Sequence, residues 1–225
     1  VHSVEAAYLI APRIGYIFVS KFGAKTYSEF LTAIAKLKNQ GASEFIIDLR
    51  GNSGGYLDAA INMINEFLVK GQLIVYTEGK ALPRSEVNAN GSGSCKADPI
   101  VVLIDEFSGS ASEIFAGAIQ DNDRGLIVGR RSFGKGLVQQ QIPFADNSAV
   151  RLTIARYYTP AGRCIQKPYE MGNSEDYNME IMNRYKHGEF YSQDSIKQQD
   201  SVQFKTLNGR IVYGGGAMII SKLFI

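Results

Sequence analysis

Ser110 stands in a segment whose pattern could supply a reactive hydroxyl. The segment FSGSASEIFAGAIQD at 107–121 follows an apolar run, begins with serines and continues with the apolar spacing of a helix. Ser110 would therefore lie where a strand turns into a helix, where its hydroxyl meets the positive end of the helix dipole. The N–H of Ala111 would be free there to hold an oxyanion. The alternative interpretation is that Ser108, Ser110 and Ser112 only cap the helix.

A serine hydroxyl needs a proton acceptor, and histidine is scarce in this chain. His2 and His187 are the only two histidines among the 225 residues, so a lysine is the natural substitute. A lysine can accept the proton when burial lowers its pKa enough to leave it neutral. Lys135 lies in SFGKG at 132–136, between two glycines and after Phe133, a setting in which a lysine can be drawn into an apolar pocket. The alternative is that Lys135 is a solvated turn residue.

The turn GNSGG at 51–55 has the G-x-S-x-G pattern of a nucleophile elbow between a strand and a helix. Ser53, Asp121 and His187 even follow in the order of an α/β-hydrolase triad. The alternative is a glycine-rich turn whose backbone N–H groups bind an oxyanion while Ser53 takes no part. His187 lies in the polar stretch NRYKHGEF, where a solvated histidine is the more common outcome.

The segment GRRSFGKG at 129–136 fits the G-x-x-x-x-G-K part of a phosphate-binding loop. Two features argue against nucleotide binding. Gly136 follows Lys135 where a serine or threonine would bind magnesium, and LVQQQ continues as a strand where a helix is needed.

Strand and helix patterns alternate along most of the chain, which places the fold in the α/β class. A T-Y-S-E capping box, from Thr26 to Glu29, is predicted to open the first helix. Residues 84–98 are predicted to form a polar loop. An antiparallel pair of strands near 137–157 predicts a mixed sheet. Strands are predicted at 14–20, 45–49, 73–76, 99–105, 125–129 and 209–225, and helices at 26–40, 57–68, 111–120 and, in a polar region, 177–185.

Composition excludes several classes of protein. A net charge of +2 with no basic block gives no footprint for nucleic acid, and no apolar run approaches the roughly 20 residues of a membrane span. Cys95 and Cys164 are too few for a disulfide framework and too far apart for a CxxC site. No metal or organic cofactor is indicated.

The opening VHSVEAAYLIAP lacks signal-peptide regions, so we expect a removed leader or an internal segment of a longer chain.

Four stretches together resemble the carboxyl-terminal processing peptidases, also called tail-specific proteases. They are IGYIFVSKF, EFIIDLRGNSGGYLDAAINMINEFL, PIVVLIDEFSGSASEIFAGAIQDNDRGLIVGRRSFGKGLVQ and RLTIARYYTPAGRCIQ, and they cover most of residues 13–168. The resemblance implies a crotonase-like fold, related to the Clp protease core. It also implies a serine endopeptidase that cleaves peptide bonds near the C-termini of protein substrates.

The resemblance assigns roles to individual residues. The catalytic serine of S-A-S-E, the lysine of F-G-K-G and a glutamine four residues later that orients the lysine correspond to Ser110, Lys135 and Gln139. The oxyanion hole corresponds to Ala111 with the glycine pair of the GNSGG turn, Gly54 and Gly55. Two further motif residues, Glu113 and Asp121, are expected to support the site.

The implied mechanism runs through an acyl-enzyme and needs no cofactor. Neutral Lys135 takes the proton of Ser110, which attacks a peptide carbonyl of a substrate bound as an extended strand. Backbone N–H groups hold the oxyanion, Lys135 returns the proton to the leaving amine, and water hydrolyses the ester.

Family members act in the periplasm, the outer cell envelope or the chloroplast lumen, and we expect a bacterial periplasm or envelope after secretion across the inner membrane. That location would permit a Cys95–Cys164 disulfide without requiring it. We expect a protease core in 1–165, a polar insertion or outer layer in 166–208, and a strand returning to the core in 209–225. The PDZ domain of most relatives is absent from this chain, so an upstream PDZ domain or an adaptor protein is an expected partner, and an oligomer remains open.

Two other functions remain open at this point. One is a catalytically silent relative that binds peptide tails or scaffolds a complex. The other is an α/β-hydrolase esterase that uses Ser53 and His187.

Overall fold

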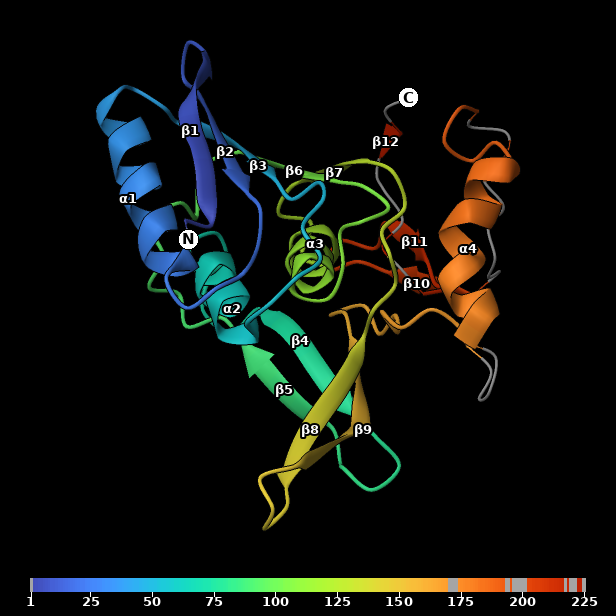
Figure 1. The fold of residues 1–225 in the computed structure, drawn as a ribbon. Helices are drawn as coiled ribbons and strands as arrows, with labels where there is room; N and C mark the ends of the chain where they lie inside the picture. The colour runs from blue at the N-terminus through green and yellow to red at the C-terminus, as the bar shows by residue number, and fades with distance from the viewer. Residues whose placement is uncertain are drawn as a thin grey trace.

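The structure is a computed structural model that describes residues 2–169, 174–192, 195, 202–216, 218 and 222–223. Its described residues form an α/β fold with a six-stranded sheet, a four-stranded sheet and a two-stranded pair. Helices lie beneath the larger sheet in Figure 1. Among the described helices, none has the length and apolar character needed to cross a membrane.

The six-stranded sheet is mixed, and its strands occur in the order β1-β2-β3-β6-β7-β12. β1 runs antiparallel to β2, and the remaining neighbours are parallel. The mixed character was predicted, but the antiparallel strand is β1 and not the pair near 137–157. β3 and β6 are the near-continuous apolar runs FIID and IVVLI, as is typical of parallel strands. The bounds are β1 (Val4–Ala11), β2 (Ile14–Val19), β3 (Glu44–Asp48), β6 (Ile100–Ile104), β7 (Leu126–Gly129) and β12 (Lys222–Leu223).

Three helices pack on one face of this sheet: α1 (Thr26–Asn39), α2 (Leu57–Asn65) and α3 (Ala111–Asp121). α3 lies at the centre of the molecule, and every one of its residues is buried. The Phe67 ring, which follows α2, meets the rings of Phe30 and Phe115 edge to face, with centroids 6.2 and 6.3 Å apart. The core therefore fixes α3, and with it the position of the residue before its first turn.

The start of α1 differs from the predicted capping box. Lys25 precedes the helix, and its side chain makes no capping hydrogen bond. Thr26 Oγ1 instead accepts from the Gly23 N–H at 2.7 Å, inside the turn before the helix. Glu29 turns to β1, where its carboxylate accepts from the N–H groups of Ser3 and Val4 at 2.7 and 3.0 Å. Glu29 thus accepts from two partly buried amides at the start of β1, and these replace the expected local contact.

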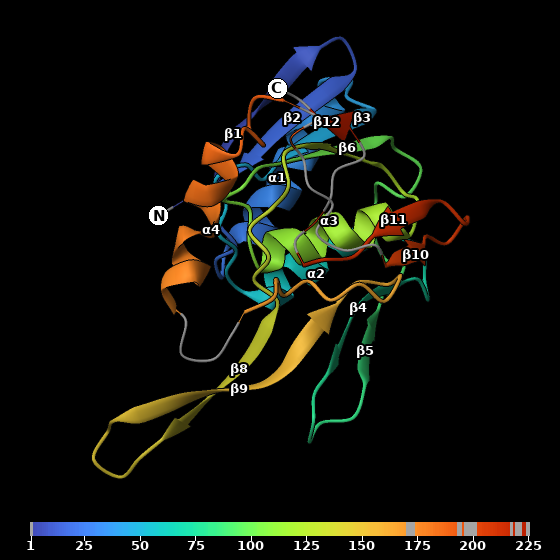
Figure 2. The same cartoon turned by 90° about the vertical axis from the view of Figure 1, so that its right-hand side faces the viewer.

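A second, four-stranded antiparallel sheet has the order β5-β4-β9-β8. The predicted antiparallel pair is β8 and β9, and Figure 2 shows that this hairpin extends away from the helices. The stretch 84–98, predicted as a loop, contains β5. Its sequence SEVN is short and polar and carries little strand signal, so its pairing with β4 decides its conformation. The bounds are β4 (Leu73–Glu78), β5 (Ser85–Asn88), β8 (Leu137–Pro143) and β9 (Ala149–Tyr158).

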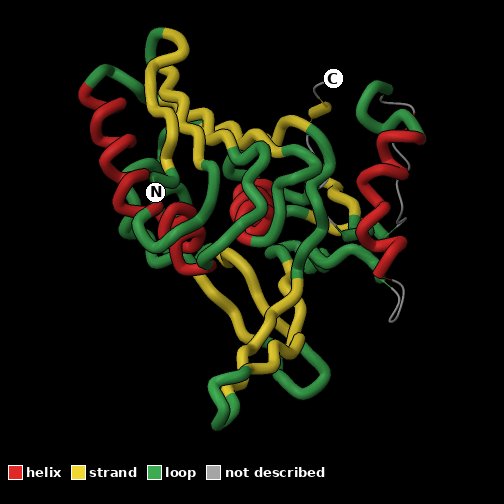
Figure 3. The backbone as a smooth tube through the Cα atoms, in the orientation of Figure 1, coloured by secondary structure: helices red, strands yellow, loops and turns green. Residues whose placement is uncertain are grey.

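The C-terminal part adds α4 (Ser174–Lys186) and the pair β10 (Gln203–Lys205) and β11 (Ile211–Tyr213). α4 contains the predicted short helix 177–185. In Figure 3, loops and the short strands β10 and β11 lie between α3 and α4. β12 lies beside β7 at the edge of the large sheet, where Lys222 is opposite Val128.

Candidate active site

Ser110 occupies the position before the first residue of α3, in a conformation that few side chains adopt. Its φ is 55° and its ψ is −114°, in the left-handed half of backbone space where a residue other than glycine is strained. Asp105 holds the loop before Ser110 together. Its Oδ1 accepts from the N–H groups of Gly51, Phe107 and Ser108 at 2.9–3.1 Å. Strain at a half-buried serine on a buried helix is typical of a functional residue.

The GNSGG turn lies directly against Ser110. A Cβ added to Gly54, whose φ is 105°, would come within 2.7 Å of the Ser110 Cβ and 3.0 Å of the Ala111 N. The main-chain oxygen of Asn52 holds the two loops together by accepting from the Gly109 N–H and the Ser112 hydroxyl. The turn and the start of α3 therefore present their backbone amides to one region.

Two of these amides are available for a ligand. In the described part of the chain, the N–H groups of Ala111 and Gly55 donate to no other group. The Gly54 N–H donates to the side-chain oxygen of Asn52 at 2.9 Å. The start of α3 and the glycine turn thus form an arrangement suited to an oxyanion.

Glu113 joins the serine to the segment that carries the lysine. It lies in the first turn of α3, fully buried, and its carboxylate accepts from the Ser110 N–H at 2.9 Å. The same carboxylate accepts from the Ser132 hydroxyl and from the N–H groups of Gly134 and Lys135 at 2.5–2.8 Å. Burial raises the pKa of Glu113, while these four donors favour its charged form.

Lys135 is exposed, so it is not drawn into an apolar pocket. The lysine beside Phe133 is Lys167, whose Nζ lies 4.3 Å from the centroid of that ring. Lys167 is buried, and burial lowers its pKa. Within the described residues, no hydrogen bond joins the side chains of Lys135 and Ser110, or that of Lys135 to the exposed Gln139 on β8.

Asp121 lies at the far end of α3 from Ser110, so the structure does not place it in the site. Its carboxylate binds the buried guanidinium of Arg163 and the Ala161 N–H.

The hydrolase triad is also contradicted, because the exposed His187 is hydrogen-bonded to the Asn183 main-chain oxygen on α4. The phosphate-loop interpretation fails because β8, and no helix, follows Lys135.

A groove of about 450 Å³, lined by both apolar and charged side chains, opens beside Asp105, toward the carboxyl ends of β2, β3, β6 and β7. Arg50 binds Asp48 there through both carboxylate oxygens, and the Tyr16 hydroxyl donates to the same carboxylate at 2.7 Å. Sequence reasoning overlooked this pair, although D-L-R directly after a buried strand is a visible signal.

Metal and disulfide chemistry find no support in the described part of the chain. No three His, Cys, Asp or Glu side chains gather there in the manner of a metal site. Cys95 is buried and Cys164 half-buried, both are free thiols, and burial raises the pKa of each.

Comparison with known proteins defines the class. Residues 13–179 match peptidase family S41. The chain is 41% identical over 154 residues to a carboxyl-terminal-processing protease of Synechocystis sp., covering 68% of this chain and 36% of the relative. It is 42% identical over 163 residues to a carboxy-terminal-processing protease of Bartonella bacilliformis, covering 71% of this chain and 38% of that relative.

The structure superposes on a photosystem II D1 C-terminal processing protease with a TM-score of 0.62 at 37% identity, covering 67% of this chain and 39% of that one. This chain belongs to peptidase family S41, whose proteases share the Clp protease-like, crotonase-like fold. It spans little more than a third of the length of these relatives.

Proposed function

We propose that this chain carries the catalytic core of a serine endopeptidase that cleaves protein substrates near their C-termini. The observation that supports this most strongly is the single carboxylate of Glu113, which accepts from the amides of both Ser110 and Lys135. That contact brings the backbones of the two proposed catalytic residues to one point. The names of the relatives supply the preference for C-terminal processing.

In the proposed reaction, Lys135 in its neutral form takes the proton of Ser110, and Ser110 Oγ attacks the peptide carbonyl carbon. The Ala111 N–H and the Gly54–Gly55 turn hold the oxyanion. Lys135 then gives the proton to the leaving amine, and water hydrolyses the acyl-enzyme ester. The Lys135 side chain must turn inward from its exposed position for the first step, and we assign Gln139 to holding it there.

The substrate is proposed to lie extended, because only an extended chain exposes its carbonyl to both the hydroxyl and the amides. We also propose that the protein acts in a bacterial periplasm or cell envelope and that an upstream PDZ domain or an adaptor selects the substrate tail. The relative from Synechocystis sp. is named a carboxyl-terminal-processing protease, and one from Tetradesmus obliquus is named a chloroplastic C-terminal processing peptidase.

The test is hydrolysis of an unfolded protein and of a peptide with an apolar C-terminus. The wild type is compared with Ser110→Ala, Lys135→Ala and His187→Ala, each checked for folding by circular dichroism. We expect the wild type and His187→Ala to cleave and the other two variants to lose at least about a thousandfold in kcat. A folded wild type that binds the peptide without cleaving it would instead indicate a silent, peptide-binding relative.

A further inference from the structure

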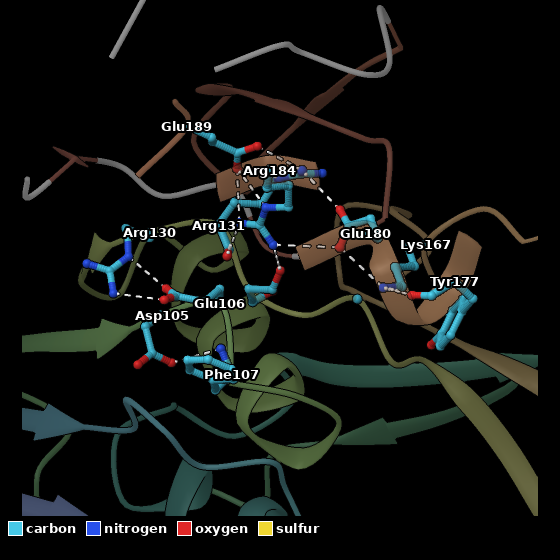
Figure 4. A network of polar contacts seen from close by, with 12 residues as sticks. Asp105, Glu106, Phe107, Arg130, Arg131, Lys167, Tyr177, Glu180, Arg184 and Glu189 are labelled. Carbon is cyan, nitrogen blue, oxygen red and sulfur yellow. Dashed lines mark hydrogen bonds and ion pairs between the residues drawn. The ribbon is translucent and has the colours of Figure 1, made fainter. Parts of the chain in front are cut away.

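The segment from Arg131 to Gly136 is held from two sides. On its inner side, Glu113 accepts from its amides, as described above. On its outer side, Arg184 of α4 donates to the main-chain oxygens of Arg131 and Ser132 at 2.6 and 3.1 Å. Figure 4 shows the guanidinium of Arg184 beside Arg131 and Glu189. Arg184 is only 5% exposed, so these contacts are shielded from water.

Glu189 fixes the direction of both arginines. Its carboxylate accepts from Arg184 Nε at 3.0 Å and from Arg131 Nε and Nη2 at 2.9 and 3.0 Å. Arg131 Nη2 also reaches Glu180 at 3.1 Å. A buried network of this kind gains little net stability, because removing its charges from water costs about as much as their attraction returns. What it does provide is one defined geometry.

Lys167 extends the same network toward Lys135. Its main-chain N–H donates to the Gly134 main-chain oxygen at 2.9 Å, and its Nζ binds Glu180 at 3.2 Å. The Nζ also lies 4.3 and 4.2 Å from the ring centroids of Phe133 and Tyr177. We call Arg131, Lys167, Glu180, Arg184 and Glu189 the outer clamp.

From these contacts we infer that Arg184, oriented by Glu189, is a positioning residue for Lys135. This inference rests on the proposed function. The Lys135 side chain is exposed, and within the described residues nothing holds it, so its reach toward Ser110 depends on where its backbone is fixed. Arg184 donates to two consecutive main-chain oxygens, those of the residues four and three positions before Lys135. Misplacing a catalytic group by about 1 Å can cost a factor of 100 in rate.

The first test compares Arg184→Gln with a matched control, Arg124→Gln. Arg124 follows the far end of α3, and its guanidinium likewise caps main-chain oxygens, those of Phe67, Cys95 and Asp98. For Arg184→Gln we expect kcat to fall by about 10- to 100-fold with KM within about threefold, and for Arg124→Gln no change in kcat per folded molecule. Arg184→Lys keeps the charge but not the fork of donors, so its kcat should lie between those of the wild type and Arg184→Gln.

The pH profile separates positioning from mere stability. In Arg184→Gln the midpoint of kcat/KM against pH should move, because the proton acceptor has a new environment, and in Arg124→Gln it should stay. If both variants lose kcat only in proportion to their folded fraction, with unchanged midpoints, the inference is wrong.

Amide hydrogen exchange tests the clamp without any activity. We expect exchange of the amides of residues 132–135 to be at least about tenfold faster in Arg184→Gln than in the wild type, and unchanged in Arg124→Gln. Should Arg184→Gln fail to fold, Glu189→Gln, which keeps the side-chain shape, takes its place. Unchanged protection in the folded variant overturns the inference. A wild type that shows this protection but never cleaves contradicts the proposed function instead.

Discussion

At the scale of single residues, the serine and the lysine are fixed to very different degrees. Ser110 is locked by the Asp105 loop, the glycine turn and the buried helix behind it. Within the described residues, Lys135 is anchored only through its backbone, by Glu113 on the inner side and, three and four residues earlier, by Arg184 of the outer clamp. The proposed nucleophile is therefore preorganised, and the position of the proposed base depends on the loop that carries it.

Replacing Gly54 by alanine should abolish most of the activity. The new Cβ would lie 2.7 Å from the Ser110 Cβ and 2.8 Å from the Gly109 main-chain oxygen, so the glycine turn or the serine must move. We expect kcat to fall by about 100-fold or more. Gly41→Ala is the control, because Gly41 also has a positive φ but nothing lies within 4 Å of an added Cβ. It should cost about 1 kcal/mol of stability without changing kcat.

Glu113→Gln should separate Ser110 from the lysine segment. A glutamine offers one acceptor oxygen where four donors meet, and its amide group would face N–H groups instead of accepting from them. Unfolding should become easier by about 1–3 kcal/mol, and kcat should fall by about 100-fold in the protein that remains folded. Thermal melting and steady-state kinetics measure the two effects, and an unchanged kcat would contradict the linking role of Glu113.

At the scale of elements, the site is held by side chains that extend from one element and bind the backbone of another. Glu29 of α1 ties down the start of β1, and Glu113 of α3 ties down the loop between β7 and β8. Two main-chain oxygens of this loop accept from Arg184 of α4, which therefore holds the loop from outside the core. Each contact satisfies backbone groups that a loop or strand edge would otherwise leave unpaired.

The junction of α1 and β1 should weaken in acid. Hydrogen bonds from the amides of Ser3 and Val4 hold the pKa of Glu29 below its ordinary value of 4.5. A lowered folded-state pKa gives a stabilisation that is fully present above 4.5 and is lost as the pH falls through the folded-state pKa. We expect the wild type to exceed Glu29→Gln in free energy of unfolding by about 1 kcal/mol at pH 7. Denaturant titrations from pH 7 to 3 should show the gap closing, and a gap independent of pH would contradict the assignment.

At the scale of the whole molecule, α3 connects two different kinds of polar structure. Its first residues form the proposed catalytic site, and its last residue, Asp121, binds Arg163 in the interior. Two other nitrogens of Arg163, Nε and Nη1, are buried without a partner in the described structure, which leaves Asp121 as the main compensation for its charge. Removing that charge leaves a buried cation unbalanced.

Asp121→Asn should therefore lower the stability of the whole fold by about 3–5 kcal/mol. Because the pair lies a helix length from Ser110, kcat per folded molecule should not change. Asp123→Asn is the matched control, since its partner Arg210 is 39% exposed, and it should cost less than about 1 kcal/mol. Equal losses of stability in the two variants would contradict the buried-charge argument. A specific loss of kcat in Asp121→Asn would show that Asp121 supports the site directly.

The sequence by itself determined the α/β class, most strands and helices, and the three segments that build the site. These follow from patterns between near neighbours: apolar runs for β3 and β6, the serine-rich start of α3, and the glycines of the GNSGG turn. Gly54 and Ala111 each lie in a short, continuous motif of the family, so the resemblance predicted both as parts of one oxyanion hole. The predicted start of α1 at Thr26 is confirmed. The loop predicted where β5 lies and the capping box predicted at Thr26 and Glu29 were wrong, because contacts with distant strands outweighed the local signal there.

Only the tertiary structure decided which charged groups meet. Nothing in the local sequence indicates that Lys167 and not Lys135 lies against Phe133, that Asp121 serves the interior and not the site, or that Arg184 binds the loop before Lys135. Each of these contacts joins residues 34 to 53 positions apart. A buried charge takes whichever partner folding brings within reach, and that choice depends on the packing of the complete chain.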